Sequence, residues 1–388
     1  MYWFRALKCI IVCSLALLVA WLTKPSAVEA VSSQSRVALL RVPDGGLQPR
    51  AVVDTAGVVH LTYFGGEPSH GDVFYSRLSN GHFGPAVRVN TQPDSAIATG
   101  NVRGPSLALG RDGRVHVAWM GSDRALRAGD AAPMLYTRSR ADGTFDPERN
   151  LHQNPGPIDG GSIAADRNGH VYVVWHSESP GSSGETRRRA WVAQSSDDGT
   201  TFAHEAAASP AESGACGCCG NTTFVDTRAA LYVLFRAARE TSHRETMLVT
   251  SSDCGKTFRP RSIQDWQVSA CPMSTFAFAE GDRATVAAWE TAGQVYWTRV
   301  DGEREERPIS APGSTGARKH PAIARNARGE TLLAWTEGMG WSRGGSLAWQ
   351  LFDNTGRPIG EPGRADVVPA WSLVAAYARP DGSFALIY

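Results

Sequence analysis

Short apolar segments that end in an aromatic residue recur along the chain, at intervals of roughly fifty residues. They lie at 58–63, 115–119, 171–175, 231–235, 284–289, 331–335 and 384–388. Their alternation and their β-branched residues predict strands, and the recurring aromatic side chain indicates packing between neighbouring sheets. The pattern therefore predicts seven related β-structured repeats rather than helices.

Each of these strands follows another apolar segment across a polar turn, and the space before the next repeat holds two more strands. The preceding segments are 49–53, 105–109, 162–165, 222–225, 274–278, 321–324 and 372–377. Four strands per repeat in a radial arrangement make a β-propeller. We therefore predict an all-β propeller of four-stranded blades, with seven blades and with six as the alternative.

The two ends of the chain are both incomplete as repeats. The last repeat stops after its second strand at residue 388, and residues 36–42 belong to no repeat of their own. Pairing these ends would remove a free sheet edge. We therefore expect the N-terminal and C-terminal strands to close one blade together.

Residues 195–202 and 251–258 both read Ser-x-Asp-x-Gly-x-Thr-Phe. In such a turn the Asp and the hydroxyl residues bond the backbone, the Gly takes a positive φ and the Phe anchors the turn. On a propeller repeat these octapeptides resemble the Asp-box, or BNR, repeats of the sialidase superfamily. The resemblance implies that they join third and fourth strands on the face away from the ligand site. We refer to them as the Asp-box turns.

The N-terminus has the features of a secretory signal peptide over residues 1–30. Arg5 and Lys8 precede an apolar segment at 9–22, and a small residue, Ala30, suits cleavage. An uncleaved membrane anchor is the alternative. We predict a single domain at 31–388 that is secreted or periplasmic, has no membrane span after cleavage and is a monomer. A formal net charge of +1 argues against nucleic acid as a partner. The basic residues 187–189 are expected to form an exposed loop tip.

Four cysteines occupy matching places in two adjacent repeats. Cys216, Cys218 and Cys219 precede the first strand of the fourth repeat, and Cys271 precedes that of the fifth. Equivalent positions on adjacent blades are neighbours, so we expect the four sulfurs together at the mouth of the central channel. Cys254 lies inside the second Asp-box turn and is expected to be an unpaired thiol on the opposite face.

Two interpretations of this cysteine cluster stand side by side. Two disulfides between the blades are typical of an exported protein. Clustered thiolates also favour a soft metal ion such as copper or zinc, and Met273 could add a thioether. A comparable C-x-C-C and C-P pair occurs in similar exported bacterial sialidase-like propellers, and that resemblance assigns no role to it.

Polar residues at the strand ends are expected around the same mouth. Several arginines together with carboxylates suit an acidic glycan, because guanidinium groups bind a carboxylate bidentately and a carboxyl group of raised pKa protonates a glycosidic oxygen. The candidate catalytic residues are Asp123, Glu178 and Glu290, and the candidate binding residues are Arg50, Arg236, Arg318 and His176. Three tryptophans outside the strand pattern could contact sugar: Trp266, Trp341 and Trp371.

Two classes of function follow from these residues. One is an exo-acting glycoside hydrolase of the sialidase type. The other is a non-catalytic module that binds a glycan, a protein or a soft metal ion at the channel mouth. The sequence favours the second, because no complete catalytic set can be identified and propellers carry many unrelated functions.

Overall fold

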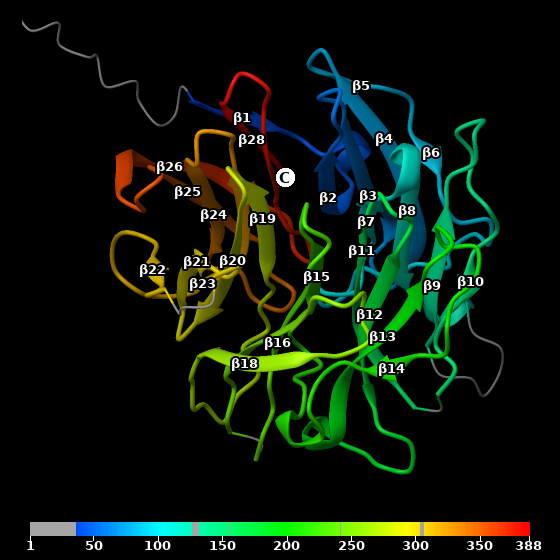
Figure 1. Cartoon of the computed structure of the whole chain (residues 1–388). Helices are drawn as coiled ribbons and strands as arrows, with labels where there is room; N and C mark the ends of the chain where they lie inside the picture. Colours follow the sequence, from blue (N-terminus) through cyan, green and yellow to red (C-terminus); the bar gives the residue numbers. More distant parts are fainter. Residues whose placement is uncertain (1–35, 126–131, 155, 241, 303–305) are drawn as a thin grey trace, which may run out of the picture. The chain divides into compact units, whose positions relative to one another are not determined.

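The computed structural model describes residues 36–125, 132–154, 156–240, 242–302 and 306–388, all within one compact unit. The predicted signal peptide at 1–30 lies outside these residues. The described part is almost entirely β, as Figure 1 shows. Its described residues also include five short 3₁₀ turns. They are η2 Pro43–Gly45, η3 Arg111–Gly113, η4 Asp123–Ala125, η5 Glu185–Arg187 and η6 Ala211–Ser213.

Seven sheets follow one another along the chain, which confirms the predicted seven-bladed propeller. The first three blades contain β2 Leu47–Val53, β3 Val59–Glu67, β4 His70–Ser79, β5 His82–Phe83 and β6 Val87–Arg88; β7 Ser106–Leu109, β8 Val115–Met120, β9 Met134–Arg138 and β10 Arg149–Asn150; and β11 Ile158–Ala165, β12 Val171–Glu178, β13 Arg188–Ser195 and β14 Ala206–Ala207. The next three contain β15 Thr222–Val225, β16 Leu231–Arg236, β17 Thr246–Ser251 and β18 Arg259–Gln264; β19 Ala277–Gly281, β20 Ala284–Thr291, β21 Gln294–Arg299 and β22 Ile309–Ser310; and β23 Arg318–Arg325, β24 Thr331–Glu337, β25 Gly345–Phe352 and β26 Pro358–Val368.

Both ends of the chain build the seventh blade, as expected. It consists of β27 Ala375–Ala378, β28 Phe384–Ile387 and the N-terminal strand β1 Val37–Leu40. β1 pairs with β28 in parallel, from Val37 opposite Phe384 to Leu40 opposite Ile387. Among the described residues this blade has three strands where the other six have four or more.

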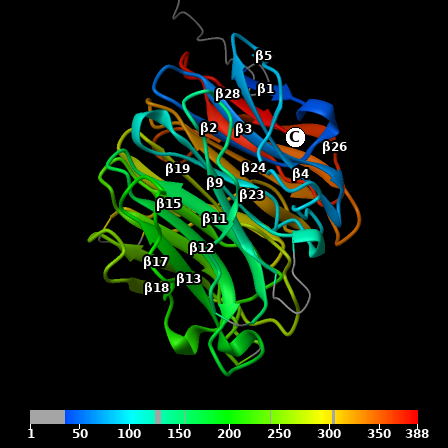
Figure 2. The same cartoon turned by 90° about the vertical axis from the view of Figure 1, so that its right-hand side faces the viewer.

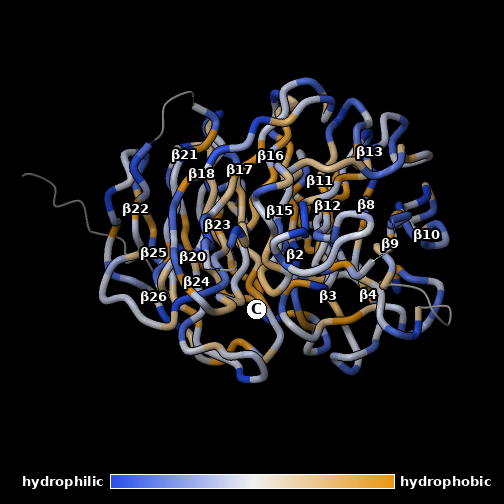
Figure 3. The backbone as a smooth tube through the Cα atoms, turned by 90° about the horizontal axis from the view of Figure 1, so that it is seen from below, coloured by the Kyte–Doolittle hydropathy of each residue, from blue (hydrophilic) through white to orange (hydrophobic). Residues whose placement is uncertain are grey.

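The innermost strands close a ring around a central channel. Each contacts the innermost strand of the next blade, in the order β2, β7, β11, β15, β19, β23, β27 and back to β2. Figure 2 shows the sheets side by side from a second direction, and Figure 3 shows hydrophobic segments concentrated in the strands. The ring brings loops from blades far apart in sequence to a common mouth.

The aromatic residues that mark the repeats pack between neighbouring blades. Trp119, Trp175 and Trp289 are fully buried, and so are the equivalent Trp335 and Phe235. Each pair of adjacent blades shares a hydrophobic cluster that includes such a residue. Because each aromatic side chain buries a large apolar area, this series explains how blades with little sequence in common adopt the same geometry.

The Asp-box turns lie at one end of the blades and the cysteines at the other. The turn at 251–258 joins β17 to β18, and Ser251 pairs with Leu231 at the start of β16. The N–H of Cys216 instead donates to the carbonyl of Arg236 at the end of β16. Six strand residues span roughly 17 Å. Cys254 is therefore separated from the other four cysteines, as predicted. We call these two ends the Asp-box face and the mouth face.

One sequence expectation about the mouth face is wrong. The basic residues 187–189 do not form a solvated loop tip, because Arg188 and Arg189 begin strand β13 and are half-buried. Arg188 lies 3.2 Å from Asp159 across the blade. The pattern Arg-Arg-Arg hid this strand, because Arg188 is paired by Asp159 and Arg189 donates to the Ser209 carbonyl, partners that lie elsewhere in the sequence. No helix within the described ranges is long and apolar enough to cross a membrane.

Candidate functional site

The loop that carries three of the cysteines is held by three blades at the mouth face. It runs from Ala215 to Gly220, between η6 and β15. Its backbone N–H groups donate from Ala215 to Glu185, from Cys216 to Arg236 and from Gly220 to Ser274, at 3.0, 2.9 and 3.1 Å. These partners belong to blades 3, 4 and 5. Backbone bonds to three blades therefore fix the loop and the positions of its cysteines.

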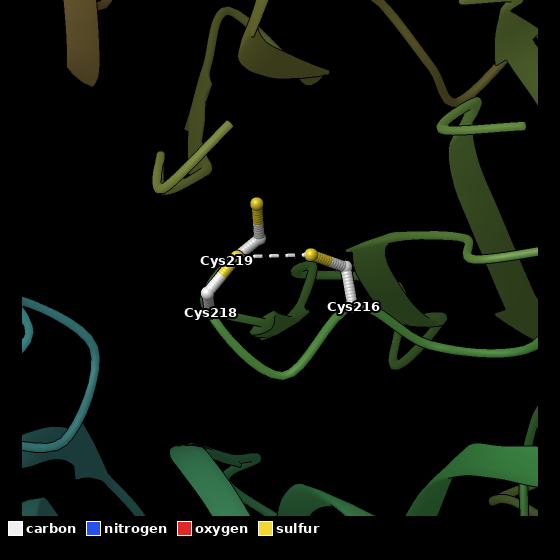
Figure 4. A group of neighbouring side chains, drawn as sticks. All are labelled: Cys216, Cys218 and Cys219. Carbon is white, nitrogen blue, oxygen red and sulfur yellow. Dashed lines mark hydrogen bonds between the residues drawn. The ribbon is translucent and has the colours of Figure 1, made fainter. Parts of the chain in front are cut away.

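The three thiols of this loop lie close together. The Sγ atoms of Cys216, Cys218 and Cys219 lie within 4.8 Å of one another. The Sγ atoms of Cys216 and Cys218 are 3.2 Å apart, as drawn in Figure 4. Cys216 and Cys219 are buried, and Cys218 is half-buried. All five described cysteines are free thiols in this structure.

A second group of ligand atoms shares Cys218 with the first. The Sγ atoms of Cys218 and Cys271 and a carboxylate oxygen of Glu185 lie within 4.8 Å of one another. Cys271 is exposed, and its loop is tied to blade 6 because Lys319 Nζ donates to the Pro272 carbonyl at 2.6 Å. The four cysteines therefore gather as the sequence predicted. Together with Glu185 they form what we call the thiol cluster, which extends from the buried Cys219 to the surface.

The electrostatics of the cluster single out Cys219. Burial opposes its ionisation, but hydrogen bonds from the Cys216 and Cys218 thiols, the charge of Arg236 and the N–H of Ser274 together hold the pKa of the Cys219 thiol well below its usual range. The bond that stabilises the Cys219 thiolate in turn raises the pKa of Cys216, and the neighbouring thiols raise that of Cys218. These directions make Cys219 the most acidic thiol of the cluster.

His176 lies in β12, close enough to Cys219 to be affected by its charge. The ring is fully buried against Phe235, with its centroid 5.9 Å from that of the phenyl ring. Neither ring nitrogen has a hydrogen-bond partner among the described residues. Burial and the nearby Arg188 lower the pKa of His176 to about 4. It is therefore a neutral imidazole at neutral pH, with one unprotonated nitrogen available to accept a proton or a ligand.

Arg236, proposed from the sequence as an anion-binding residue, is bonded to the chain through both Nη atoms, whereas its Nε has no partner among the described residues. It is completely buried, its guanidinium lies 5.1 Å from the Trp266 ring centroid, and it donates to Arg244 O and Thr246 Oγ1 at 2.9 and 3.0 Å. It also donates to the Glu290 carbonyl. These contacts make Arg236 a structural group that supplies positive charge to Cys219.

Glu290, a candidate acid, faces Arg236 across the interface between blades 4 and 5. Its Oε2 is 3.7 Å from Arg236 Nη2, and its Oε1 accepts from the N–H of Gly293 at 2.7 Å. Burial raises the pKa of Glu290 in spite of the opposing charge of Arg236. A raised pKa suits a general acid. However, this carboxyl group is almost fully buried beside its partner.

The other candidates for a hydrolytic site are distributed around the mouth. Arg318 at the start of β23 is buried and donates to Glu337 at 3.2 Å and to Gln294 at 3.0 Å. Glu178 at the end of β12 accepts from the Gly184 N–H at 2.9 Å. Asp123 is an exposed residue of η4 on blade 2. Four of the proposed catalytic and anion-binding residues, Arg236, Glu290, Arg318 and Glu178, are thus engaged by the chain itself.

Arg50 differs from the other two arginines. It lies in β2 and lines the central channel, where it is half-buried. Its guanidinium makes no ion pair or hydrogen bond with any described residue. Burial lowers its pKa to about 10. Within the described part of the chain, it is therefore a charged group without a counter-ion.

Sequence reasoning missed two parts of the mouth. Glu185 lies in a Gly/Ser-rich segment far from the cysteines along the chain, and nothing in the sequence connected it to them. Asp159 accepts from Arg103 at 2.8 Å and from Arg188 at 3.2 Å, which links blade 2 to blade 3 beside the cysteine loop. The sequence position of Asp159 does indicate that it lies at the mouth. Asp159 comes just before the predicted first strand of the third repeat, as the cysteines come just before the first strands of the fourth and fifth repeats.

No protein-family model matches this sequence, and no curated protein matches it either. Solved structures with a similar fold do exist. The α-L-arabinanase of Penicillium chrysogenum complexed with arabinobiose has 13% sequence identity and a TM-score of 0.54, over 81% of this chain and 95% of that chain. The α-L-arabinofuranosidase of Fusarium graminearum in complex with an iminosugar inhibitor has 11% identity and a TM-score of 0.52, over 82% of this chain and 97% of that chain.

A polysaccharide lyase that acts on ulvan also has a similar fold, with 10% sequence identity and a TM-score of 0.52 over 88% of this chain and 87% of that chain. These identities are low enough that the likeness concerns the fold alone. The chain is thus a β-propeller of the kind found in glycoside hydrolases and polysaccharide lyases, with a thiol cluster at its mouth face.

Proposed function

We propose that this protein is a ligand-binding propeller whose mouth face holds one soft metal ion, Cu(I) or Zn(II), in the thiol cluster. The observation that carries the proposal is the convergence of Cys216, Cys218 and Cys219 with all three Sγ atoms within 4.8 Å of one another. Thiolate sulfur is the preferred donor for both ions. The signal segment at 1–30 leads us to propose in addition that the propeller acts outside the cytoplasm.

The spacing of the sulfurs supports a metal ion at their centre. Four thiolates around Zn(II), each at about 2.3 Å, place the sulfurs about 3.8 Å from one another. The Sγ atoms of Cys216, Cys218 and Cys219 all lie within 4.8 Å of one another, a limit that includes this spacing. Cys271 and Glu185 lie near Cys218 and are the candidates for a fourth ligand, and Glu185 also accepts a hydrogen bond from Arg244 at 2.8 Å. The backbone bonds to three blades would hold the ligands in place before the ion binds.

The charges around the cluster also support this proposal. Cys219 has a lowered pKa and would be the first thiolate to bind the ion. The ion must then displace the protons of Cys216 and Cys218, so affinity should rise with pH. Arg236 offsets part of the negative charge that several thiolates accumulate. The neutral imidazole of His176 is close enough to feel that charge and could add a nitrogen ligand.

Glycan binding on the mouth face is a second candidate function, in either a lectin-like or a hydrolytic form. The observation that favours it is Trp341, which is 46% exposed in the loop between β24 and β25. This loop reaches the loop of blade 2, where a Cβ added to Gly100 would lie 3.1 Å from the Trp341 ring. An exposed indole at the mouth offers a flat face for a sugar ring. Turnover or binding of acidic glycosides, lost in Trp341→Ala, tests this candidate directly.

Elemental analysis combined with thiol mapping tests the metal proposal. The protein is purified without reductant, its metal content is measured, and it is denatured and alkylated before peptide mass spectrometry. A metal site predicts one equivalent of copper or zinc and alkylation of all five described cysteines. Two disulfides predict no metal and alkylation of Cys254 alone. Cys219→Ser should lose the metal, and Cys254→Ser is the matched control that should retain it.

A further inference from the structure

The central channel is lined by one equivalent residue from each blade. Each of them lies on an innermost strand, opposite the residue that comes just before the recurring aromatic of the second strand. Arg50 lies opposite Thr62 in this way, and Ser106 lies opposite Ala118. The ring of seven consists of Arg50, Ser106, Ser162, Thr222, Ala277, Ala322 and Ala375, all of which line a cavity of about 150 Å³. One level of the channel therefore has a polar half on blades 1 to 4 and an apolar half on blades 5 to 7.

Arg50 provides the only charge at this level among the described lining residues. No carboxylate lines the cavity with it, and no described residue pairs with its guanidinium. The nearby His320 carries no charge at neutral pH, because burial and adjacent cations lower its pKa to about 3. A guanidinium offers five N–H donors in a planar fork. Since Arg50 is half-buried, it retains only part of the hydration that an exposed arginine has.

The hydroxyl groups beside Arg50 are not all equally available. Ser162 donates to Asn221 Oδ1 at 2.7 Å, and Thr222 donates to the Phe276 carbonyl at 2.9 Å, so both protons are in use. Ser106 Oγ instead accepts from the N–H of Ile163 at 3.2 Å and donates its own proton to no residue in the described ranges. Ser106 is thus the hydroxyl donor on the blade next to Arg50.

The opposite side of the cavity has no polar side chain at this level. Ala277, Ala322 and Ala375 occupy the ring positions there, and Phe276 and Val374 line the same cavity. Such a surface favours an apolar group over water. A ligand that satisfies both sides has an anionic end and a short apolar body.

We propose that the central channel binds one small organic carboxylate, with its carboxylate group on Arg50 and Ser106 and its aliphatic body against the alanine half of the ring. The site is distinct from the thiol cluster and does not depend on it. Arginine binds a carboxylate through two parallel N–H···O bonds, which fits a planar anion with two oxygens. The hydroxyl of Ser106 can donate to one of these oxygens. A cavity of about 150 Å³ is large enough for a molecule the size of benzene, so a chain of about four carbons fits.

The test measures binding of sodium butyrate to the full chain by isothermal titration calorimetry, with butan-1-ol and sodium sulfate as comparison ligands. Butyrate should bind to the wild type with a stoichiometry of one. Arg50→Gln should weaken binding about tenfold or more, because it removes the charge, and Ser106→Ala should weaken it by a smaller factor. Arg77→Gln, which changes an exposed arginine of the same blade, is the matched control and should bind as the wild type does.

Thermal unfolding without ligand provides an independent readout. Because Arg50 has no counter-ion among the described residues, Arg50→Gln should melt at the same temperature as the wild type or higher, and butyrate should raise the melting temperature of the wild type only. Failure of Arg50→Gln to fold would show that the guanidinium has a structural partner and would overturn the proposal. It is also overturned if butyrate does not bind, if butan-1-ol binds equally well or if sulfate binds as tightly as butyrate.

Discussion

The two faces of the propeller satisfy their polar groups in opposite ways. On the Asp-box face, Asp197 accepts hydrogen bonds from the N–H and the hydroxyl of Thr201 at 2.8 and 2.7 Å, so the turn completes its own bonds. On the mouth face, His176 has no partner among the described residues for either ring nitrogen, and three thiols converge from one loop held by three blades. Because buried polar groups are nearly always bonded, a buried imidazole without a described partner, close to three converging thiols, indicates a place for a ligand.

The same contrast separates two arginines that are both candidate anion-binding residues in the sequence. Arg236 is fully buried and bonded by residues of blades 4 and 5, whereas Arg50 lines the channel without a partner in the described chain. The first is needed for the fold, and the second is available for an anion. Sequence position gave no reason to distinguish them, because both stand at strand ends next to apolar residues.

Replacement of Arg236 should give the largest effect. Arg236→Ala leaves the carboxyl group of Glu290 buried without its partner, and we expect it to lower the free energy of unfolding by about 3–5 kcal/mol. Urea unfolding measures this change. The double variant Arg236→Met with Glu290→Gln, which removes both charges, should recover much of the loss. A loss below about 1 kcal/mol in the single variant would mean that the pair contributes little to the fold.

Acidification should affect the mouth face through His176. Its pKa in the fold is about 4 and its usual value is 6.5, so between these pH values the unfolded chain binds more protons than the folded one. The stability that neutral His176 contributes is therefore fully present above pH 6.5. It is lost as the pH falls toward 4, which lowers the free energy of unfolding by about 3 kcal/mol. Unfolding of the metal-free protein at several pH values should show a shallower decline in His176→Leu. An identical decline in both proteins would assign the effect to other groups.

Removal of an Asp-box carboxylate should have a smaller effect, limited to its own face. Asp197→Ala deletes the acceptor of several hydrogen bonds in an exposed turn, and we expect a loss of about 1 kcal/mol in the free energy of unfolding. The metal content of this variant should equal that of the wild type. If the variant lost the metal without a general loss of structure, the two faces would not be independent.

The smallest effect is expected for the cysteine on the Asp-box face. Cys254→Ser should change the free energy of unfolding by no more than about 0.5 kcal/mol, because Cys254 is a half-buried residue at an exposed turn. Its metal content should also be unchanged. Cys219→Ser is the comparison, since the same substitution on the mouth face replaces the thiol of lowest pKa. Equal metal loss in both variants would contradict the separation of the cysteines.

The repeat made the architecture predictable from the sequence. The marker residues from Tyr63 to Trp335 fixed the strands, because large aromatic side chains are needed between blades and leave a regular period. The same period placed Cys216 and Cys271 on adjacent blades. It also predicted that the two chain ends share a blade, although the parallel pairing of β1 with β28 was not foreseen.

The repeat does not predict which polar side chains are bonded within the fold. Whether an arginine is bonded or free depends on partners in other blades, such as Glu290 for Arg236, and the sequence does not give their distances. The same limitation hid Glu185, which approaches Cys218 and Cys271 only because the 3₁₀ turn η5 brings blade 3 over the cysteine loop. The fifty-residue period predicts where strands end. The contacts between blades determine whether a polar residue at a strand end is bonded or can bind a ligand.

X-ray absorption spectroscopy of the protein loaded with one equivalent of Cu(I) or Zn(II) tests the central claim most directly. A thiol-cluster site predicts that sulfur atoms dominate the nearest neighbours of the ion, with three or four of them at about 2.3 Å for Zn(II), and that Cys219→Ser reduces their number. An ion surrounded by oxygen and nitrogen alone, or an unchanged spectrum in Cys219→Ser, would contradict the account.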